Sequence, residues 1–476
     1  MTFDLPIVGL LILLAIAYAL LPTNWRTWAL FAGSIIGVYA LQPRLQIRWL
    51  DFLLPTLTLL LTMATWFLTR KAEQVFSRDD KIAFAGTALL VIGLALLRYV
   101  PSDYRIFVAS RPPNLTIIVG FALIILVISL VFSRLYFSHR AMLLLLLILF
   151  IFLKTDILAT WISTIMRRAT NQDVSQARAI DLGWLGFSYV AFRLIHTIRD
   201  RQSDILPTLS LRDYVAYIVF FPSFIAGPID RAERFLDDLR HVPKLKRFDS
   251  VRFTEGCTRI GIGIFKKFVI ADFLAQGMSL NATHAAQVEN SFGLWLLLYG
   301  YALRLFFDFA GYSDIVIGIG ILFGIKLPEN FHHPYTRSSI TEFWQNWHIT
   351  LSDWVRTYVF SPFSRWILRL KPRPAAFITV LLAQLLTMLI IGLWHGVSIN
   401  FLLWGLWHGI GLWLHKQFSD RTRKWYRGLK ERKWQFRLWK TGTWFITFHF
   451  VVLGWVWFAL SDVNLSIKVF SVLFGY

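Results

Sequence analysis

The chain has 476 residues, a formal net charge of +21 at pH 7 and a mean hydropathy of +0.55. Charged residues make up 16% of it, against about 25% in an ordinary soluble protein, and this excludes a single soluble domain. Apolar blocks recur along the whole chain at lengths near the roughly 20 residues that a helix needs to cross a bilayer. We therefore expect one integral membrane domain.

The basic residues lie mostly in short segments between the apolar blocks. This is the positive-inside pattern, so the charge indicates membrane topology and argues against nucleic-acid binding. Membrane lipids, and anionic headgroups in particular, are the expected partners of these segments. A single cysteine, Cys257, allows no disulfide within the chain and no cysteine-based metal site.

The first apolar block, Leu5–Leu21, has no basic segment before it, so we expect a retained span and not a cleaved signal peptide. Between about residues 160 and 375 the apolar blocks are shorter and are interrupted by polar residues, and the whole chain predicts about 11 to 14 membrane segments. This central part indicates either an internal site or cytoplasmic loops with amphipathic helices, and the pattern leaves both open. The clear apolar blocks are 5–21, 27–42, 50–68, 83–99, 115–133, 141–158, 376–394, 397–415, 443–460 and 464–475.

Two basic segments, 365–373 and 416–440, are expected to be cytoplasmic. The apolar blocks 376–394 and 397–415 between them then form a hairpin, and its tip lies toward the opposite face. At this tip His395 interrupts the apolar sequence. An ionisable residue in a membrane segment is a functional candidate by default, and histidine exchanges a proton near neutral pH.

The alternative for His395 is a structural histidine that bonds to a carbonyl near the interface. A near copy of its motif, Trp407-His408-Gly409, follows thirteen residues later. One of the two histidines is expected to be structural, and the sequence leaves a role for His408 open.

The segment from Ser339 to Tyr358 is predicted to be one helix. Ser339 and Glu342 fit a capping box, and aromatic residues recur after it at spacings of three and four. Such a stripe is more often packing or an interfacial belt than a binding surface. His348 borders the stripe, at a place suited to a group that handles a proton.

Two carboxylates, Asp308 and Asp314, lie six residues apart in an apolar stretch. They are expected either to pair with cationic side chains or to line a polar path. The sequence has no Gly-rich phosphate loop, no zinc-type histidine pair and no nucleophile elbow, so no metal site is expected.

A set of motifs between Leu185 and the C-terminus occurs in an order and spacing that together are specific. Through this set the chain resembles the membrane-bound O-acyltransferase (MBOAT) family. The resemblance is to its bacterial branch, which includes the alginate O-acetylation membrane protein and the teichoic acid D-alanyl transfer protein. In order, the motifs are Gly186-Phe187-Ser188-Tyr189; Phe220-Phe221-Pro222 with Ala226-Gly227-Pro228-Ile229; Phe265-Lys266-Lys267 with Ala271-Asp272; Asp308 to Asp314; Pro328-Glu329-Asn330-Phe331 with Pro334-Tyr335; Glu342-Phe343-Trp344 with Trp347-His348; and Trp394-His395-Gly396.

The resemblance implies an all-α polytopic membrane fold around a central tunnel. Residues 1–170 would supply N-terminal transmembrane helices, and residues 171–476 the catalytic region of one continuous membrane domain. His395 matches the catalytic histidine of the family, and His348 matches its second histidine. The implied lining of the tunnel or substrate site is Trp394, Trp347, Asp308, Tyr312, Asp314 and Asn330.

Two positions depart from the pattern of the branch: Ala310 stands where serine is usual, and Ala459 where arginine is common. These departures leave the two histidines in place and put the substrate in doubt.

The function implied is an O-acyltransferase of a bacterial-type inner membrane. It would move an acyl group, acetyl in the first instance, to a hydroxyl of an exported polysaccharide or cell-envelope polymer. The donor would be acetyl-CoA or an acyl-carrier thioester from the cytoplasm, with no bound cofactor. A separate extracytoplasmic acyltransferase is the expected partner, because the chain has no soluble extracytoplasmic domain.

Two alternatives stay open. A lipid- or protein-directed O-acyltransferase of the same fold would need a long-chain donor. A membrane transporter would use Asp308, Asp314 and His395 as an ion path. Transporters often have two matching halves, and the sequence has no such symmetry.

Overall fold

The computed structural model describes residues 4–476 apart from 72, 122, 124–137 and 248. The described residues form helices joined by turns and contain no strand, which confirms the predicted all-α membrane fold. Two compact units divide the chain: Met1–Ile260 with Val316–Leu327, and Gly261–Ile315 with Pro328–Tyr476. The functional division predicted at residue 170 does not coincide with this boundary and stays a prediction.

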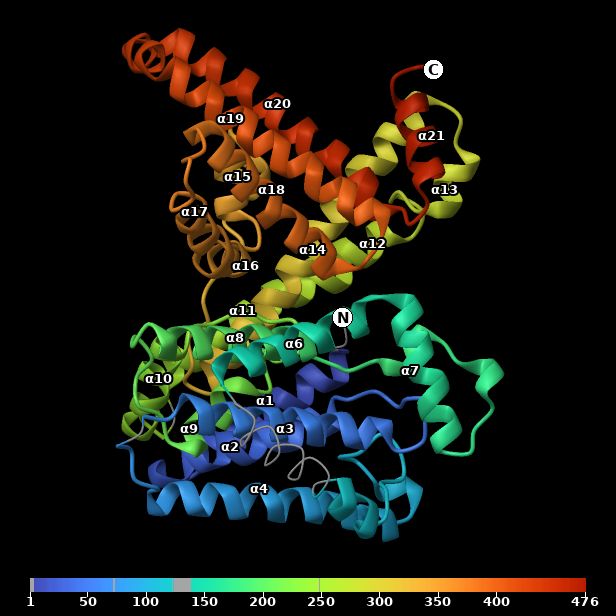
Figure 1. The fold of residues 1–476 in the computed structure, drawn as a ribbon, viewed down its shortest axis with the longest axis vertical. Helices are drawn as coiled ribbons and strands as arrows, with labels where there is room; N and C mark the ends of the chain where they lie inside the picture. Colours follow the sequence, from blue (N-terminus) through green and yellow to red (C-terminus); the bar gives the residue numbers. More distant parts are fainter. Residues whose placement is uncertain (1–3, 72, 122, 124–137, 248) are drawn as a thin grey trace. The chain divides into compact units, whose positions relative to one another are not determined.

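The first unit holds the helices of the N-terminal half (Figure 1). It also contains most of α11 (Ser250–Ile264) and the end of α14 (Ser291–Leu322). Its other helices are α1 (Leu5–Leu20), α2 (Thr23–Ala40), α3 (Leu50–Thr69), α4 (Arg78–Leu96), α6 (His139–Lys154), α7 (Asp156–Ala169), α8 (Phe187–Gln202), α9 (Leu211–Ile218) and α10 (Ala232–His241), with short 3-10 turns η1 (Leu97–Tyr99), η2 (Ser102–Tyr104), η3 (Val174–Gln176), η4 (Ala179–Leu182) and η5 (Val242–Lys244).

The first four predicted spans correspond to the helices α1 to α4. Local sequence sets the start of α4, because Ser77 and Asp80 form a capping box in which each side chain accepts from the other's backbone N–H. Most of the span predicted at 115–133 lies outside the described residues. The span predicted at 141–158 is not continuous, since α6 and α7 meet at an angle of 93° (Figure 1).

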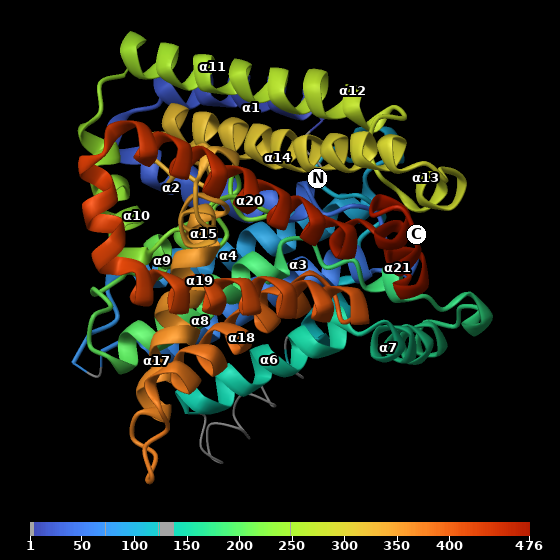
Figure 2. The same ribbon diagram turned by 90° about the horizontal axis from the view of Figure 1, so that it is seen from above.

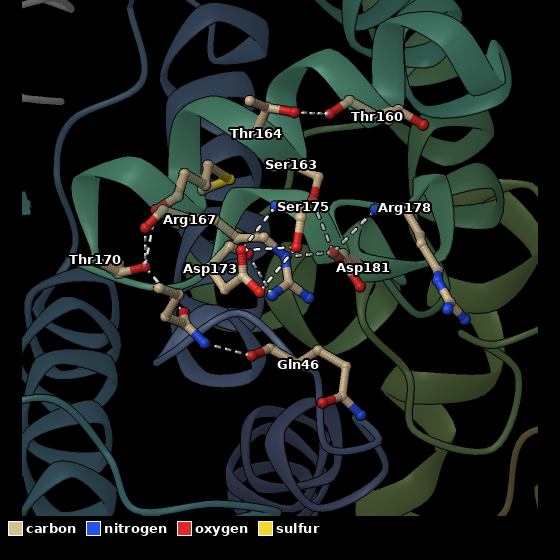
Figure 3. Close-up of polar contacts among 12 residues, drawn as sticks. Gln46, Thr160, Ser163, Thr164, Arg167, Thr170, Asp173, Ser175, Arg178 and Asp181 are labelled. Carbon is tan, nitrogen blue, oxygen red and sulfur yellow. Dashed lines mark hydrogen bonds and ion pairs between the residues drawn. The ribbon is translucent and has the colours of Figure 1, made fainter.

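A buried ion pair fixes the segment that follows this bend (Figure 3). Asp181 accepts hydrogen bonds from the Arg167 guanidinium at 2.9 Å, from the Ser163 hydroxyl at 2.7 Å and from the Arg178 backbone N–H at 3.2 Å. Burial opposes ionisation of Asp181, but these bonds outweigh it and hold the pKa of its carboxyl below the usual range. The ion pair thereby joins η4 to α7.

The second unit holds the helices of the C-terminal part, together with the beginning of α14 (Figure 2). They are the π-helical turns η6 (Phe265–Ala271) and η8 (Arg356–Phe360), the 3-10 turn η7 (Pro334–Thr336), and α12 (Asp272–Ala275), α13 (Ala282–Gln287), α15 (Ile340–Asn346), α16 (Ile349–Val355), α17 (Ser361–Ile367), α18 (Ala376–His395), α19 (Ile399–Glu431), α20 (Lys433–Ala459) and α21 (Val463–Leu473).

The predicted spans 376–394 and 443–460 are confirmed as helices, and 464–475 corresponds to α21. The predicted span 397–415 is only the first part of α19, which continues to Glu431. The basic segment 416–440 lies between predicted spans, but it is not an irregular loop: it is helical except for a turn at Arg432. Its long straight-chain residues are good helix formers, which explains the difference.

Five described helical stretches are long and apolar enough to cross a bilayer, and the bent pair α6–α7 would make a sixth. The predicted total of about 11 to 14 segments stays a prediction. The five are Leu50–Thr69, Arg78–Tyr99, Ser291–Leu322, Ala376–His395 and Lys433–Ala459.

Candidate active site

The predicted hairpin that carries His395 is confirmed. Helix α18 ends at His395, and α19 starts after the N-cap Ser398, whose hydroxyl accepts the Phe401 N–H at 3.3 Å. The two helices lie side by side in both views (Figures 1 and 2). A Cβ atom on Gly392 would lie 2.3 Å from the Phe401 carbonyl oxygen, so only glycine permits this close approach one turn before His395.

The half-buried imidazole of His395 lies among aromatic rings. Its centroid is 4.5 Å from that of Trp394 and 4.7 Å from that of Phe458, and the rings of Phe401 and Trp404 are both at 5.8 Å. These rings fix the orientation of the imidazole through packing.

His348 lies between two helices and not on one, so the prediction of a single helix from Ser339 to Tyr358 is wrong. Ser339 does cap a helix, and its hydroxyl accepts the Glu342 N–H at 3.2 Å. That helix, α15, ends at Asn346, and His348 has left-handed backbone angles of φ 43° and ψ 55° before α16 begins. Such a conformation costs about 1–2 kcal/mol for a residue other than glycine.

The His348 side chain is buried, with 3% of its surface exposed. The Phe309 ring meets its imidazole edge to face at 4.7 Å, and neither ring nitrogen has a hydrogen-bond partner among the described residues. Burial lowers the pKa of His348, which lies outside the membrane-spanning helices, to about 3. The imidazole is therefore neutral and carries one donor and one acceptor nitrogen.

Both histidines line the same small cavity, of about 40 Å³. A cavity of this size can hold a small group next to the two imidazoles. Every other lining side chain is apolar or aromatic: Leu305, Phe309, Trp344, Trp347, Leu351, Ile391, Trp404, Trp455 and Phe458.

A second and larger cavity, of about 240 Å³, adjoins the small one, since Trp344 and Ile391 line both. Its remaining lining is mixed. Its polar side chains come from α15, α16, η8 and α18, and its apolar ones come from α16, η8, α18 and α19. The residues that line only this cavity are Thr341, Gln345, Ser352, Asp353, Val355, Arg356, Phe360, Gln384, Thr387, Met388 and Leu412.

His408, the second histidine of the repeated motif, does not belong to the lining of the small cavity. It is fully buried, and its Nδ1 accepts the indole N–H of Trp344 at 3.4 Å. Its ring also packs against Trp404 at 5.0 Å. The structure thus places His408 where it holds Trp344, the side chain between the two cavities.

The two carboxylates of α14 are ion-paired, which was one of the two outcomes expected for them. Lys266 Nζ lies 2.7 Å from Asp314 Oδ2, and Lys267 pairs with Asp308. Both lysines lie on the π-helical turn η6, and in the sequence they stand out only as part of the Phe265-Lys266-Lys267 motif. Neither aspartate belongs to the lining of the two cavities. The lining role predicted for them stays a prediction.

The other predicted site residues differ in position. Trp347 lines the small cavity, and the Trp394 ring lies within 4.5 Å of His395 and 6.2 Å of His348. Tyr312 and Asn330 are both fully buried and line neither cavity. Among the residues that the structure describes, no group of three His, Cys, Asp or Glu side chains could hold a metal ion.

Two histidines line one apolar cavity, and other residues of its lining lie on α14, α18 and α20, which are long and apolar enough to cross a membrane. These features are those of an integral membrane protein with ionisable residues at an internal site. The comparison with known families gives the particular family. The model of MBOAT, the membrane-bound O-acyltransferase family, matches residues 132–458, and the chain belongs to this family.

Three relatives illustrate the range of the similarity. The chain is 35% identical over 296 residues to a probable alginate O-acetylase of Pseudomonas aeruginosa (61% of this chain, 52% of the relative). It is 32% identical over 279 residues to a teichoic acid D-alanyltransferase of Bacillus subtilis (58% and 69%), and 36% identical over 264 residues to a peptidoglycan O-acetyltransferase of Helicobacter pylori (55% and 46%). The match spans about half the length of the first of these relatives.

Proposed function

We propose that the chain transfers an acyl group, an acetyl group in our hypothesis, to a hydroxyl of an exported polysaccharide or cell-envelope polymer. The observation that carries the proposal is the meeting of His348 and His395 in one cavity of about 40 Å³. The relatives support the kind of acceptor, since their names refer to alginate, teichoic acid and peptidoglycan. We infer that the protein acts in the inner membrane of a bacterium.

The size of the cavity supports acetyl as the acyl group. An acetyl group, with three heavy atoms, is one of the smallest acyl groups, and the cavity between the histidines is small. A long acyl chain would have to displace the aromatic rings around the histidines, which are closely packed. The lipid- or protein-directed alternative, which needs a long-chain donor, is therefore less well supported.

In the proposed reaction, His395 accepts the proton of the acceptor hydroxyl while the hydroxyl oxygen attacks the thioester carbonyl. An ester C–O bond forms, the C–S bond breaks, and the proton goes to the leaving sulfur. Base catalysis of this kind contributes about 10²- to 10⁴-fold to a rate. The neutral imidazole of His348 orients the acceptor or delivers the proton to sulfur. The apolar lining limits hydrolysis of the thioester by water.

We propose that the larger cavity receives the thioester donor. It adjoins the small cavity across Trp344 and Ile391, and its amide and hydroxyl groups suit the polar arm of a thioester. We propose acetyl-CoA or an acyl-carrier thioester as this donor, used as a substrate and without a bound cofactor. A separate extracytoplasmic acyltransferase is proposed as the partner that completes the transfer.

The test compares cells that lack the chain with cells that produce wild type or the His395→Ala variant. Acetate released by mild base from the envelope carbohydrate is measured, together with the amount of protein in the membrane. We expect a loss of at least about 10²-fold in the variant. His449, a histidine of α20 that lines neither cavity and bonds Tyr299, gives the control variant His449→Ala.

Equal acetate in wild type and His395→Ala cells would overturn the proposed role of His395. Loss in both histidine variants would indicate a general structural effect. The partner is tested separately: purified wild-type chain that acetylates the polymer without any other protein would exclude the need for one.

A further inference from the structure

The environment of Asn330 links two parts of the structure that surround His348. Asn330 is fully buried, and its side chain uses both of its polar atoms. Its amide NH2 donates to the Ser313 hydroxyl on α14 at 3.3 Å, and its Oδ1 accepts the Thr350 hydroxyl on α16 at 2.6 Å. The amide therefore connects α14 to the first turn of α16.

Each end of this connection lies next to His348. Thr350 is in the first turn of α16, which begins directly after His348. Ser313 is one helical turn beyond Phe309 on α14, and residues four apart share a helix face. Phe309 is the residue whose ring packs edge to face on the His348 imidazole at 4.7 Å. The Asn330 side chain is therefore bonded both to the backbone element that follows His348 and to the helix face that carries its ring neighbour Phe309.

The backbone around Asn330 also bonds to the residues on both sides of His348, which lies in the short non-helical segment between α15 and α16. The Asn330 carbonyl accepts the Ile349 N–H at 2.9 Å, immediately after His348. Phe331 forms an antiparallel bridge with Trp347, immediately before it. His348 is therefore held from both sides in its left-handed conformation by the segment 330–331. No bond to the imidazole itself takes part, so the ring is oriented through its backbone and packing.

We propose that Asn330 is a positioning residue, which holds His348 in its left-handed conformation and aims the imidazole into the small cavity. This inference rests on the proposed function, because it assumes that His348 takes part in acyl transfer. The lining role predicted for Asn330 stays a prediction beside it. Asparagine is suited to the task because it offers a donor and an acceptor at once without adding a buried charge.

The test is a double-mutant cycle between positions 330 and 348. The initial rate of accumulation of base-labile acetate on envelope carbohydrate is measured per amount of membrane-inserted protein. We expect Asn330→Ala to lower the rate about 10- to 100-fold, because a displacement near 1 Å at a reacting group can cost about 10²-fold. In the His348→Ala background the same substitution is expected to change the rate less than about 3-fold, since it acts through His348. If His348→Ala cells fall to the level of cells without the chain, His348→Gln replaces it in the cycle.

Two further variants, Thr350→Val and Ser313→Ala, each remove one of the two side-chain hydrogen bonds of Asn330. They take the place of Asn330→Ala in the double-mutant cycle if that variant does not fold. Each is expected to lower the rate in wild type and to add little to Asn330→Ala. Asn400→Ala is the matched control: Asn400 is equally buried and also makes two side-chain bonds, to the Leu460 carbonyl and the Ser466 hydroxyl. Its effect, whatever its size, is expected to persist in the His348→Ala background.

The outcomes separate this inference from the function on which it rests. Reduced rates in both single variants, without further reduction in the double variant, support the positioning role. A double variant that loses the full product of the two effects overturns it and leaves the role of His348 intact. An unchanged rate in His348→Ala cells overturns the role of His348 in transfer, and the inference with it.

Discussion

Replacement of Trp344 by alanine should relax the preference for a short acyl group. The Trp344 indole lies between the cavity of about 40 Å³ at the histidines and the cavity of about 240 Å³ beside it, and it lines both. The bond from its N–H to His408 holds the ring in this place. Without the indole, the small cavity opens into the larger one, so a longer chain can extend past the reacting carbon.

The magnitude follows from the size of the small cavity. One methylene group too many in a tight apolar pocket costs about 10- to 200-fold in specificity. Wild type should therefore favour acetyl over propionyl by a factor in this range, and Trp344→Ala should reduce the preference to below about 10-fold. Ile391→Ala, which changes the other shared wall residue, should shift the preference in the same direction.

The assay measures the short-chain acids that mild base releases from the envelope carbohydrate of cells supplied with propionate and butyrate. Leu412→Ala is the control, because Leu412 lines only the larger cavity and its loss does not join the two. The reasoning is refuted if wild type already transfers propionyl and butyryl freely. It is also refuted if Trp344→Ala, present in the membrane at normal levels, keeps the full preference for acetyl.

Three further substitutions test the structure around the site. Asp181→Ala should lower the free energy of unfolding by about 3–5 kcal/mol above about pH 4, because it leaves Arg167 buried without its carboxylate partner. This difference between wild type and variant should vanish as the pH falls through the depressed pKa of Asp181. Thermal unfolding in detergent measures the difference, and equal stability at pH 7 would contradict the prediction. Gly392→Ala should lower acetylation and the unfolding temperature together, since its Cβ would meet the Phe401 carbonyl; a normal unfolding temperature would show that the hairpin tolerates the clash. Lys266→Met should lower the amount of folded protein, because Asp314 is buried and loses the ion pair with Lys266. Lys266→Met with Asp314→Leu should restore it, since an apolar pair leaves no buried charge. A double variant as poor as the single one would indicate that the charges themselves are needed.

The sequence was sufficient for features that depend on local pattern. Apolar length identified the helices α1 to α4, α18 and α20, because a span of about 20 residues is visible within its own window. The hairpin at His395 was predicted from two apolar blocks and the basic segments on both sides of them, which require the chain to return. The resemblance to MBOAT rested on the order of short motifs, and the family model confirms it.

Features that depend on distant contacts could not be predicted in this way. The aromatic spacing from Ser339 onward is helical, but bonds from Asn330 and Phe331 break the helix at His348. The partners of Asp308 and Asp314 lie more than forty residues earlier in the chain, on the π-helical turn η6. The contact between His408 and Trp344 likewise joins residues that are 64 positions apart. In each case the deciding interaction is absent from any single window of sequence.

The most direct test of the central claim measures acyl transfer across the membrane itself. Inverted membrane vesicles from cells that produce wild type or His395→Ala are given ¹⁴C-acetyl-CoA from outside, which is the cytoplasmic face, with and without cytosol as a source of acyl-carrier protein. Label that accumulates inside the vesicles as a base-labile ester of polymer is counted. We predict label with wild type and at least about 10²-fold less with His395→Ala. Equal label with both chains, or in vesicles without the chain, would contradict an acyltransferase that works through His395.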